Sequence, residues 1–242
     1  MRIYTVGCSF THGDELVNPS SSAWPTLLGN MMSAEVNNDA ISGGTNYRNV
    51  YRTIKSTVEK YDLYIVAWTH ASRYTFYKSE NNFEINFNPQ LINNIYGNSS
   101  FFKDWGKTLY YHWHNELYAF KSWLQQIILL QSFLKDKNYI MLNTMPNNLN
   151  QWLAPWPEFI QATSSLINFD LMDDAQIFDE HKEIQYYVNQ IDKANFYCWQ
   201  KFCITDLCTQ FKCGTGGHLL EDGHQHLANL IYSHVQNQRY YS

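Results

Sequence analysis

Residues 2–11 read RIYTVGCSFT, a short apolar run followed by a glycine and small polar residues. An apolar run of this length that ends at a turn residue is typical of a strand buried inside a parallel sheet. Because the run ends at Gly7, Ser9 falls just beyond the carboxyl end of the strand. Reactive groups gather at this edge in parallel α/β sheets. These ten residues therefore predict a class of fold and mark a position for chemistry.

The same kind of pattern recurs along the chain. Strands are predicted over residues 35–40, 62–68 and 139–143, of which 62–68 (DLYIVAW) is the clearest. Helical spacing of apolar residues separates them, over residues 24–32, 46–60, 117–134 and 221–235. This alternation predicts a three-layer α/β/α fold of the flavodoxin-like kind, with a central parallel sheet. A length of 242 residues fits one domain, so residues 1–242 are interpreted as a single domain.

The middle of the chain is rich in aromatic residues and follows no clear period. Aromatic residues make up 17% of the sequence, enough to supply a surface for sugars or proteins as well as a core. Residues 75–116 are interpreted as an insertion or a lid, and residues 146–180 as a loop. Trp152 and Trp156 lie beside prolines. They form either an aromatic platform for sugar rings or a rigid loop that packs on itself, and the pattern favours neither.

Composition excludes several classes of protein. The net charge is −5 and no run of Lys and Arg occurs, so no nucleic-acid partner is expected. No apolar stretch has the length of a membrane span, and the first eight residues lack the features of a signal peptide. We therefore expect cytoplasmic synthesis and no membrane association. Five cysteines suit a reducing compartment and are interpreted as buried apolar residues.

Four predicted strand ends carry residues suited to acyl transfer: Ser9, Gly43, Thr69 and His218. A serine hydroxyl becomes a good nucleophile when a histidine accepts its proton. The oxyanion that forms needs fixed donors, and a glycine main chain supplies one without a side chain in the way. The set predicts a serine ester hydrolase that needs no metal and no organic cofactor. Cys8 is a rival nucleophile, but its place inside the strand end predicts that it points into the core.

Four segments resemble the sequence blocks of the GDSL/SGNH hydrolases. They are YTVGCSFTHGDEL (4–16), NDAISGGTN (38–46), DLYIVAWTHASR (62–73) and GGHLLEDGHQHLANLI (216–231). The third block looks like that of a phage-encoded branch, in which a Trp-Thr pair replaces Gly-x-Asn. The resemblance covers the first 75 residues and the last 30, and it leaves the middle unassigned.

The resemblance implies a role for each matched residue. Ser9 is the nucleophile and His218 the catalytic base. Gly43 and Thr69 hold the oxyanion, and Asn46 belongs to the same oxyanion and substrate-binding set. No metal site is implied.

One residue of the family pattern is missing. The family places a carboxylate three residues before the base, and that position is Thr215. Leu219 stands where the family prefers proline. Asp14 and Glu15, near the nucleophile, are interpreted as a solvated acidic pair. His218 is therefore left either in a Ser–His dyad or with an acid supplied from elsewhere.

A shift in register gives an alternative base. His224 then takes the role of His218, with Glu221 three residues ahead of it or Asp222 two ahead. The sequence alone leaves both alternatives open.

Three functions follow from these features. The first is an esterase or deacetylase that removes a small acyl group, with a carbohydrate as the expected carrier. The second is a weakly active or inactive module with the same fold, which binds a glycan or phage virion proteins and resides in a virion. The third, a metalloenzyme, would use His112 and His114 on one face of a strand.

Overall fold

The structure is a computed structural model that describes residues 1–78, 83–87, 100–167 and 172–238. The chain divides into two compact units. The first comprises Met1–His70, Ser132–Pro146 and Asp192–Ser242, and the second Ala71–Gln131 and Asn147–Ile191. The predicted insertion, residues 75–116, falls inside the second unit, and part of it lies outside the described residues. The interpretation as a single domain stays a prediction.

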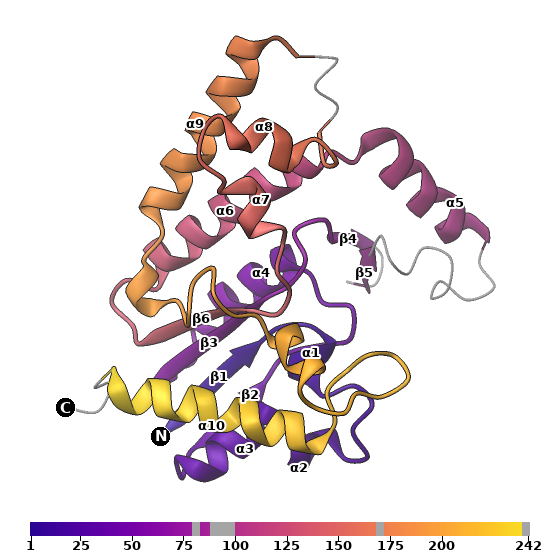
Figure 1. Ribbon diagram of the computed structural model, residues 1–242. Coiled ribbons are helices and arrows are strands. Elements are labelled where there is room, and N and C mark those ends of the chain that lie inside the picture. Colours follow the sequence, from indigo (N-terminus) through magenta and orange to yellow (C-terminus); the bar gives the residue numbers. More distant parts are fainter. Residues whose placement is uncertain (79–82, 88–99, 168–171, 239–242) are drawn as a thin grey trace. The chain divides into compact units, whose positions relative to one another are not determined.

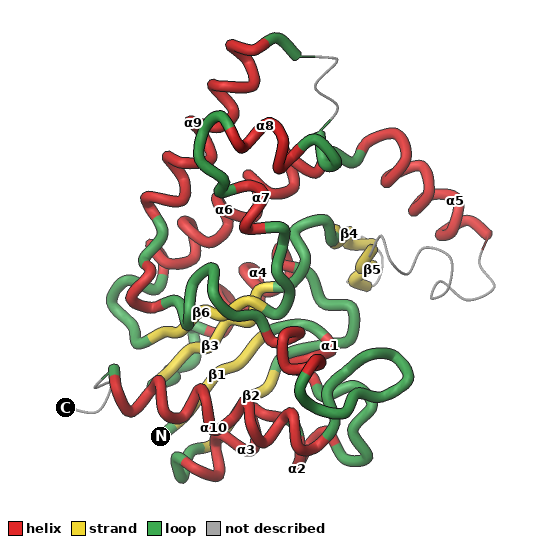
Figure 2. Tube along the Cα trace, in the orientation of Figure 1, coloured by secondary structure: helices red, strands yellow, loops and turns green. Residues whose placement is uncertain are grey.

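The first unit is built on a sheet of four parallel strands. These are β1 (Arg2–Val6), β2 (Glu35–Asn38), β3 (Leu63–Trp68) and β6 (Tyr139–Asn143). Their order is β2-β1-β3-β6, and Figure 2 shows them side by side. Each strand lies where the apolar pattern predicts one. The predicted parallel sheet is therefore confirmed.

Helices α3 (Trp24–Met31) and α10 (Glu221–Asn237) cover one face of this sheet and pack against each other (Figure 1). Alternate strand residues point towards them, because side chains in a strand alternate between faces. Ile3, Ile65 and Leu142 belong to this set, and all are fully or almost fully buried in one cluster with Leu28 and Leu227. The cluster is the main hydrophobic core of the first unit.

Helix α4 (Asn46–Ser56) contacts β1 and β3 from the other face. Tyr4 and Tyr64 alternate along their strands with residues of the core cluster, so they point to this other face. Both are buried. Asn49 of α4 donates a hydrogen bond to the Ala67 carbonyl at 3.2 Å. Because helices cover both faces, the predicted α/β/α layering is confirmed.

Short helices complete the first unit and connect the strands to the larger helices. They are α1 (Ser9–His12), α2 (Pro19–Ser22), and the 3-10 turns η4 (Lys193–Asn195) and η5 (Ile204–Thr209). Two residues, Gly7 and Cys8, separate the end of β1 from the start of α1.

The second unit is mainly helical. Its elements are a hairpin of β4 (Tyr74–Lys78) and β5 (Phe83–Phe87), α5 (Ser100–Thr108), the π-helix η2 (Leu109–Trp113), most of α6 (Glu116–Phe133), α7 (Leu149–Trp152), α8 (Glu158–Thr163) and α9 (Asp174–Gln190). The Phe120 and Trp152 rings stack at 5.1 Å between centroids, and Trp152 is 1% exposed. Trp152 therefore packs in a core and is not part of a surface platform.

The prediction of a loop over residues 146–180 is wrong. Helices α7 and α8 lie in it, and α9 begins in it. Helix α9 starts with a capping box, in which Asp173 accepts from the Gln176 main chain and Gln176 accepts from that of Asp173. Among the described residues, no helix is both long and apolar enough to cross a membrane.

Candidate active site

Ser9 is the first residue of α1, directly beyond β1. It is 5% exposed, and within the described residues neither its hydroxyl nor its main-chain N–H makes a hydrogen bond. Cys8 is fully buried in the core cluster, which agrees with the prediction that it points inward. Gly7 permits the sharp turn, because a Cβ there would lie 2.4 Å from Thr11 Oγ1.

The loop after β2 lies against the turn that carries Ser9. A Cβ on Gly44 would lie 2.6 Å from the Gly7 carbonyl oxygen and 3.4 Å from the Cα of Cys8, so the two main chains touch at this point. Gly43, which precedes Gly44 in this loop, has φ +69 and open space where a side chain would be. Its N–H makes no hydrogen bond within the described residues. Gly43 therefore has a main-chain donor without a partner there, on the loop that lies against the turn of Ser9.

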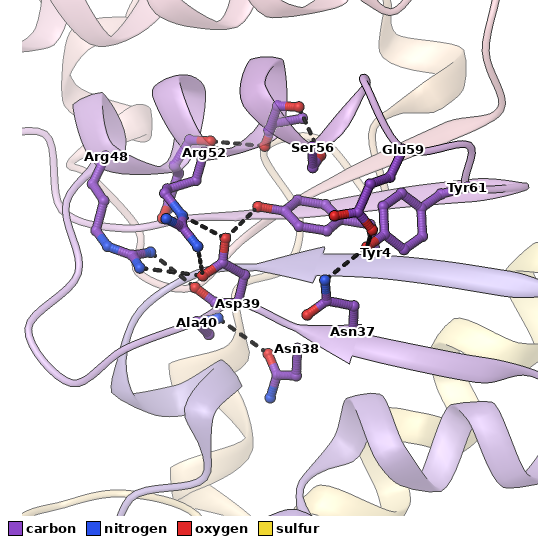
Figure 3. Close-up of polar contacts among 12 residues, drawn as sticks. Tyr4, Asn37, Asn38, Asp39, Ala40, Arg48, Arg52, Ser56, Glu59 and Tyr61 are labelled. Carbon is purple, nitrogen blue, oxygen red and sulfur yellow. Dashed lines mark hydrogen bonds and ion pairs between the residues drawn. The ribbon is translucent and has the colours of Figure 1, made fainter.

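A buried ion cluster anchors the start of this loop (Figure 3). The Asp39 carboxylate accepts from Arg52 at 2.6 and 2.8 Å, from Arg48 at 3.3 Å and from the Tyr4 hydroxyl at 2.8 Å. Arg48 also donates to the Asp39 carbonyl at 2.8 Å. These contacts fasten the loop to α4 and β1. Burial, and to a smaller degree the negative charge of Asp39, raise the pKa of Tyr4 far above its usual value. The Tyr4 hydroxyl therefore stays protonated and remains a hydrogen-bond donor.

Asn38, the first residue of the second block, connects the same loop to α1. Its Oδ1 accepts from Thr5 Oγ1 at 3.0 Å and from the Ala40 N–H at 3.3 Å. Its Nδ2 donates to the Thr11 carbonyl of α1 at 3.0 Å. One side chain therefore bridges β1, α1 and the loop that carries Gly43.

Asn46 holds the end of β3. Its Oδ1 accepts from the Thr69 N–H at 2.8 Å, and its Nδ2 donates to the carbonyls of Thr69 and His70 at 3.0 and 3.3 Å. Asn46 is 3% exposed and Thr69 is fully buried. Both ends of the amide are thus engaged with main chain. The geometry gives Asn46 a role in positioning Thr69, and its place in the substrate-binding set stays a prediction.

His218 lies in a tight turn before α10, and its ring packs on the ring of Phe10 at 4.8 Å between centroids. Phe10 is the residue after Ser9. An isolated antiparallel β-bridge between Cys213 and Leu219 closes the turn. Inside it, the Gly214 N–H donates a hydrogen bond to the His218 carbonyl at 2.9 Å. The loop that carries His218 is therefore folded against α1.

Glu15 contacts His218, which the sequence interpretation missed. One carboxylate oxygen of Glu15 lies 3.0 Å from His218 Nδ1. Glu15 is an exposed residue, as predicted, but its carboxylate is engaged by this loop, and its side chain and that of His218 are 22% and 19% exposed. Main-chain hydrogen bonds from Gly216 and His218 lower the pKa of Glu15 to about 2, so it is ionised near neutral pH. Asp14 instead pairs with His12 at 2.7 Å.

His224, the alternative base, is fully buried in α10. Its Nδ1 accepts a hydrogen bond from the Trp24 N–H of α3 at 3.1 Å. Burial lowers the pKa of His224 to about 4, so the ring is neutral. A ring whose acceptor nitrogen caps another helix is a structural residue. The geometry favours His218 as the base.

The predicted histidine pair does not lie on a strand. His112 is in the π-helix, and His114 follows it with Nδ1 2.7 Å from the Tyr74 hydroxyl and Nε2 2.9 Å from Glu116. The argument from a shared strand face is therefore wrong. In the parts of the chain that the structure describes, no three His, Cys, Asp or Glu side chains are grouped to hold a metal ion.

No protein-family model matches this sequence, and no curated protein matches it. Among solved structures, it is similar to an esterase from Pseudoalteromonas sp. inhibited by monoethylphosphonate, at 9% identity, with 98% of this chain and 97% of that chain covered and a TM-score of 0.50. This likeness shows a shared fold.

Two further solved structures match with lower TM-scores. A catalytic mutant of an acetylxylan esterase from Geobacillus stearothermophilus has 10% identity, coverage of 97% and 93%, and a TM-score of 0.46. A member of the lipolytic G-D-S-L family from Veillonella parvula has 11% identity, coverage of 98% and 96%, and a TM-score of 0.42.

Proposed function

We propose that the protein is a serine ester hydrolase that removes a small acyl group from a polar carrier. The observation that carries this proposal is the meeting of three loops at one edge of the sheet. They bear Ser9, the N–H of Gly43, which has no hydrogen-bond partner within the described residues, and the ring of His218 packed on Phe10. A nucleophile, an oxyanion donor and a base are the parts that acyl transfer requires.

In this reaction Ser9 Oγ attacks the ester carbonyl carbon, and its proton passes to His218 Nε2. The oxyanion of the tetrahedral intermediate accepts hydrogen bonds from the N–H groups of Gly43 and Ser9, with Thr69 as the predicted further donor. His218 then gives the proton to the departing alcohol oxygen. Water, deprotonated by His218, releases the acyl group from Ser9 as a carboxylic acid.

Ser9 Oγ and His218 are not hydrogen-bonded in this structure. Catalytic hydrogen bonds are often long in the absence of substrate and tighten when it binds. Ser9 is 5% exposed and Gly43 is partly exposed, so the part of Ser9 that substrate can reach is small.

A carbohydrate carrier is the part of the proposal that rests on aromatic content. Aromatic residues make up 17% of the sequence, and Tyr47 and Tyr51 of α4, in the first unit, are 54% and 46% exposed. Exposed rings of this kind offer apolar faces to sugar rings while their polar atoms stay in water. Acetylated sugars are therefore the first substrates to test.

The test measures acetate release from p-nitrophenyl acetate and from acetylated xylan fragments. Wild type and Ser20→Ala, which removes an exposed hydroxyl on α2, should hydrolyse at least one of them. Ser9→Ala should lose at least about 1,000-fold in kcat/KM with an unchanged melting temperature. Equal rates in Ser9→Ala and wild type would overturn the proposal.

The second candidate is an inactive module of this fold, with a glycan or virion proteins as partners. The absence of a Ser9–His218 hydrogen bond and the lack of an acid at Thr215 favour it. It predicts glycan binding that is equal in wild type and Ser9→Ala, with no ester hydrolysed by either. Isothermal titration with acetylated and deacetylated xylan fragments separates the two candidates.

A further inference from the structure

Both oxygens of the Glu15 carboxylate accept hydrogen bonds from the loop that carries His218. Oε1 accepts from the Gly216 N–H at 2.7 Å and from Thr215 Oγ1 at 3.2 Å. Oε2 accepts from the His218 N–H at 3.0 Å and faces His218 Nδ1 at 3.0 Å. Glu15 is thus bound to three residues that are about two hundred positions away in sequence.

Two glycines of the loop leave room for this carboxylate where it lies. A Cβ on Gly214 would lie 2.5 Å from the Glu15 carboxyl carbon, and one on Gly216 would lie 3.0 Å from its Oε2. Glu15 itself has φ +68, a left-handed conformation that residues with a Cβ rarely adopt. Unfavourable backbone conformations persist where the surrounding structure holds them, and they cluster at functional sites. Both partners are therefore shaped for this contact.

The contact determines which ring nitrogen of His218 can act. An ionised carboxylate accepts hydrogen bonds and donates none, so a proton on Nδ1 faces Glu15. The lone pair is then on Nε2, where within the described residues no hydrogen bond engages it. This is the tautomer in which a histidine accepts a proton from a serine. A negative charge beside Nδ1 also stabilises the imidazolium that forms after the transfer.

We propose that Glu15 positions the catalytic base: it holds His218 in the Nδ1–H tautomer and stabilises its protonated form, in place of a carboxylate at position 215. The Thr215 hydroxyl, where the family pattern puts the acid, instead donates to Glu15. The acid is thus supplied from the segment that follows the nucleophile. This inference rests on the proposed hydrolase function for its catalytic part.

The first test reads the ring of His218 directly and needs no activity. In the ¹⁵N-histidine spectrum of neutral-ring wild type, the His218 signals, assigned by their loss in His218→Asn, should show a protonated Nδ1 and an unprotonated Nε2. Glu15→Gln should lose this single tautomer, and Asp14→Asn, a matched neighbour paired with His12, should keep it. An Nε2–H tautomer in wild type, or an unchanged tautomer in Glu15→Gln, would overturn the proposal.

The second test measures kcat and KM separately with p-nitrophenyl acetate. Glu15→Gln should lower kcat by roughly 100- to 10,000-fold with KM changed little, because the base is misoriented while the rest of the site stays intact. Thr215→Val removes the hydrogen bond from the Thr215 hydroxyl to Glu15 and leaves the contact between Glu15 and His218 Nδ1. It should keep kcat within about tenfold of wild type. The double variant Glu15→Gln/Thr215→Asp restores a carboxylate at the family position and should regain part of kcat.

These results separate the two proposals. A wild type that hydrolyses no ester but shows the Nδ1–H tautomer, lost in Glu15→Gln, contradicts the hydrolase function and leaves the pairing of Glu15 with His218 standing. An active wild type whose kcat is unchanged in Glu15→Gln contradicts the role of Glu15 and leaves the hydrolase standing. A melting curve of each variant identifies any variant that has lost its fold. If Glu15→Gln is such a variant, the tautomer of His218 in wild type decides whether the role proposed for Glu15 stands.

Discussion

His224 Nδ1 accepts a hydrogen bond from the Trp24 main-chain N–H at 3.1 Å, and this contact joins α10 to the first turn of α3. The first N–H groups of a helix have no partner inside the helix, so the buried imidazole supplies one. The acceptor must be neutral, and burial holds the pKa of His224 at about 4.

This contact predicts a pH dependence of stability. The unfolded chain binds a proton at His224 near the ordinary value of 6.5, whereas the folded chain binds it near 4. Stability is therefore full above about 6.5 and falls as pH drops towards 4, by about 3 kcal/mol. In His224→Gln this slope of the free energy of unfolding should flatten, as urea titrations at several pH values would show. His226→Gln, on the same helix, is the control and should keep the slope; equal slopes in wild type and His224→Gln would contradict the assignment.

The ion cluster of Figure 3 predicts that Asp39→Asn is strongly destabilising. Arg48, with a side chain 5% exposed, would keep its charge and lose its counter-ion. Loss of one partner of a buried pair costs about 3 kcal/mol or more. Chemical unfolding would measure it against Asp179→Asn, which breaks an exposed pair with Lys182 and should cost less than about 0.5 kcal/mol. Similar losses in the two variants would show that the cluster is not a determinant of stability.

Neighbouring glycines should respond differently to alanine. Gly44→Ala places a Cβ 2.6 Å from the Gly7 carbonyl oxygen, so the turn that carries Ser9 has to move. We expect a loss of about 2 kcal/mol or more and at least a tenfold lower kcat/KM. Gly43→Ala meets no atom and carries only the strain of φ +69, about 1 kcal/mol. Thermal melts with ester assays test the order; a milder effect of Gly44→Ala would refute the contact between the loops.

Asn46→Ala should weaken the end of β3. It leaves the buried N–H and carbonyl of Thr69 without the amide that serves both, at a cost of about 1–3 kcal/mol. Because Thr69 then loses its position, kcat should fall more than KM rises. The matched variant is Asn37→Ala. Asn37 is exposed and donates one hydrogen bond to the Tyr61 hydroxyl, so its loss should lower the free energy of unfolding by less than about 1 kcal/mol. Steady-state kinetics of Asn46→Ala equal to wild type would remove Asn46 from the site.

The sheet was predictable because β3 and β6 are buried on both faces. Residues 63–68 and 139–142 are unbroken apolar runs, which are typical of strands inside a parallel sheet. Helix α9 was missed because its surface is polar and its apolar positions are sparse. A start signal was present, since Asp173 is followed three residues later by Gln176.

The partner of His218 was not predictable from spacing. Glu15 and His218 are 203 residues apart, and their meeting depends on a left-handed backbone at Glu15 and on room left by Gly214 and Gly216. The density of glycines before His218 was the available signal. It indicates close approach of another group, but it does not identify that group.

The most direct measurement of the central claim is the site of attachment of a fluorophosphonate, which reacts with an activated serine to form a stable mimic of the tetrahedral intermediate. Wild type treated near neutral pH and digested should carry the adduct on the peptide that contains Ser9. The same treatment of Ser9→Ala and His218→Asn should give no adduct, because one lacks the nucleophile and the other the base. An unlabelled Ser9 in folded wild type, or labelling that persists unchanged in His218→Asn, would contradict a serine hydrolase built on these two residues.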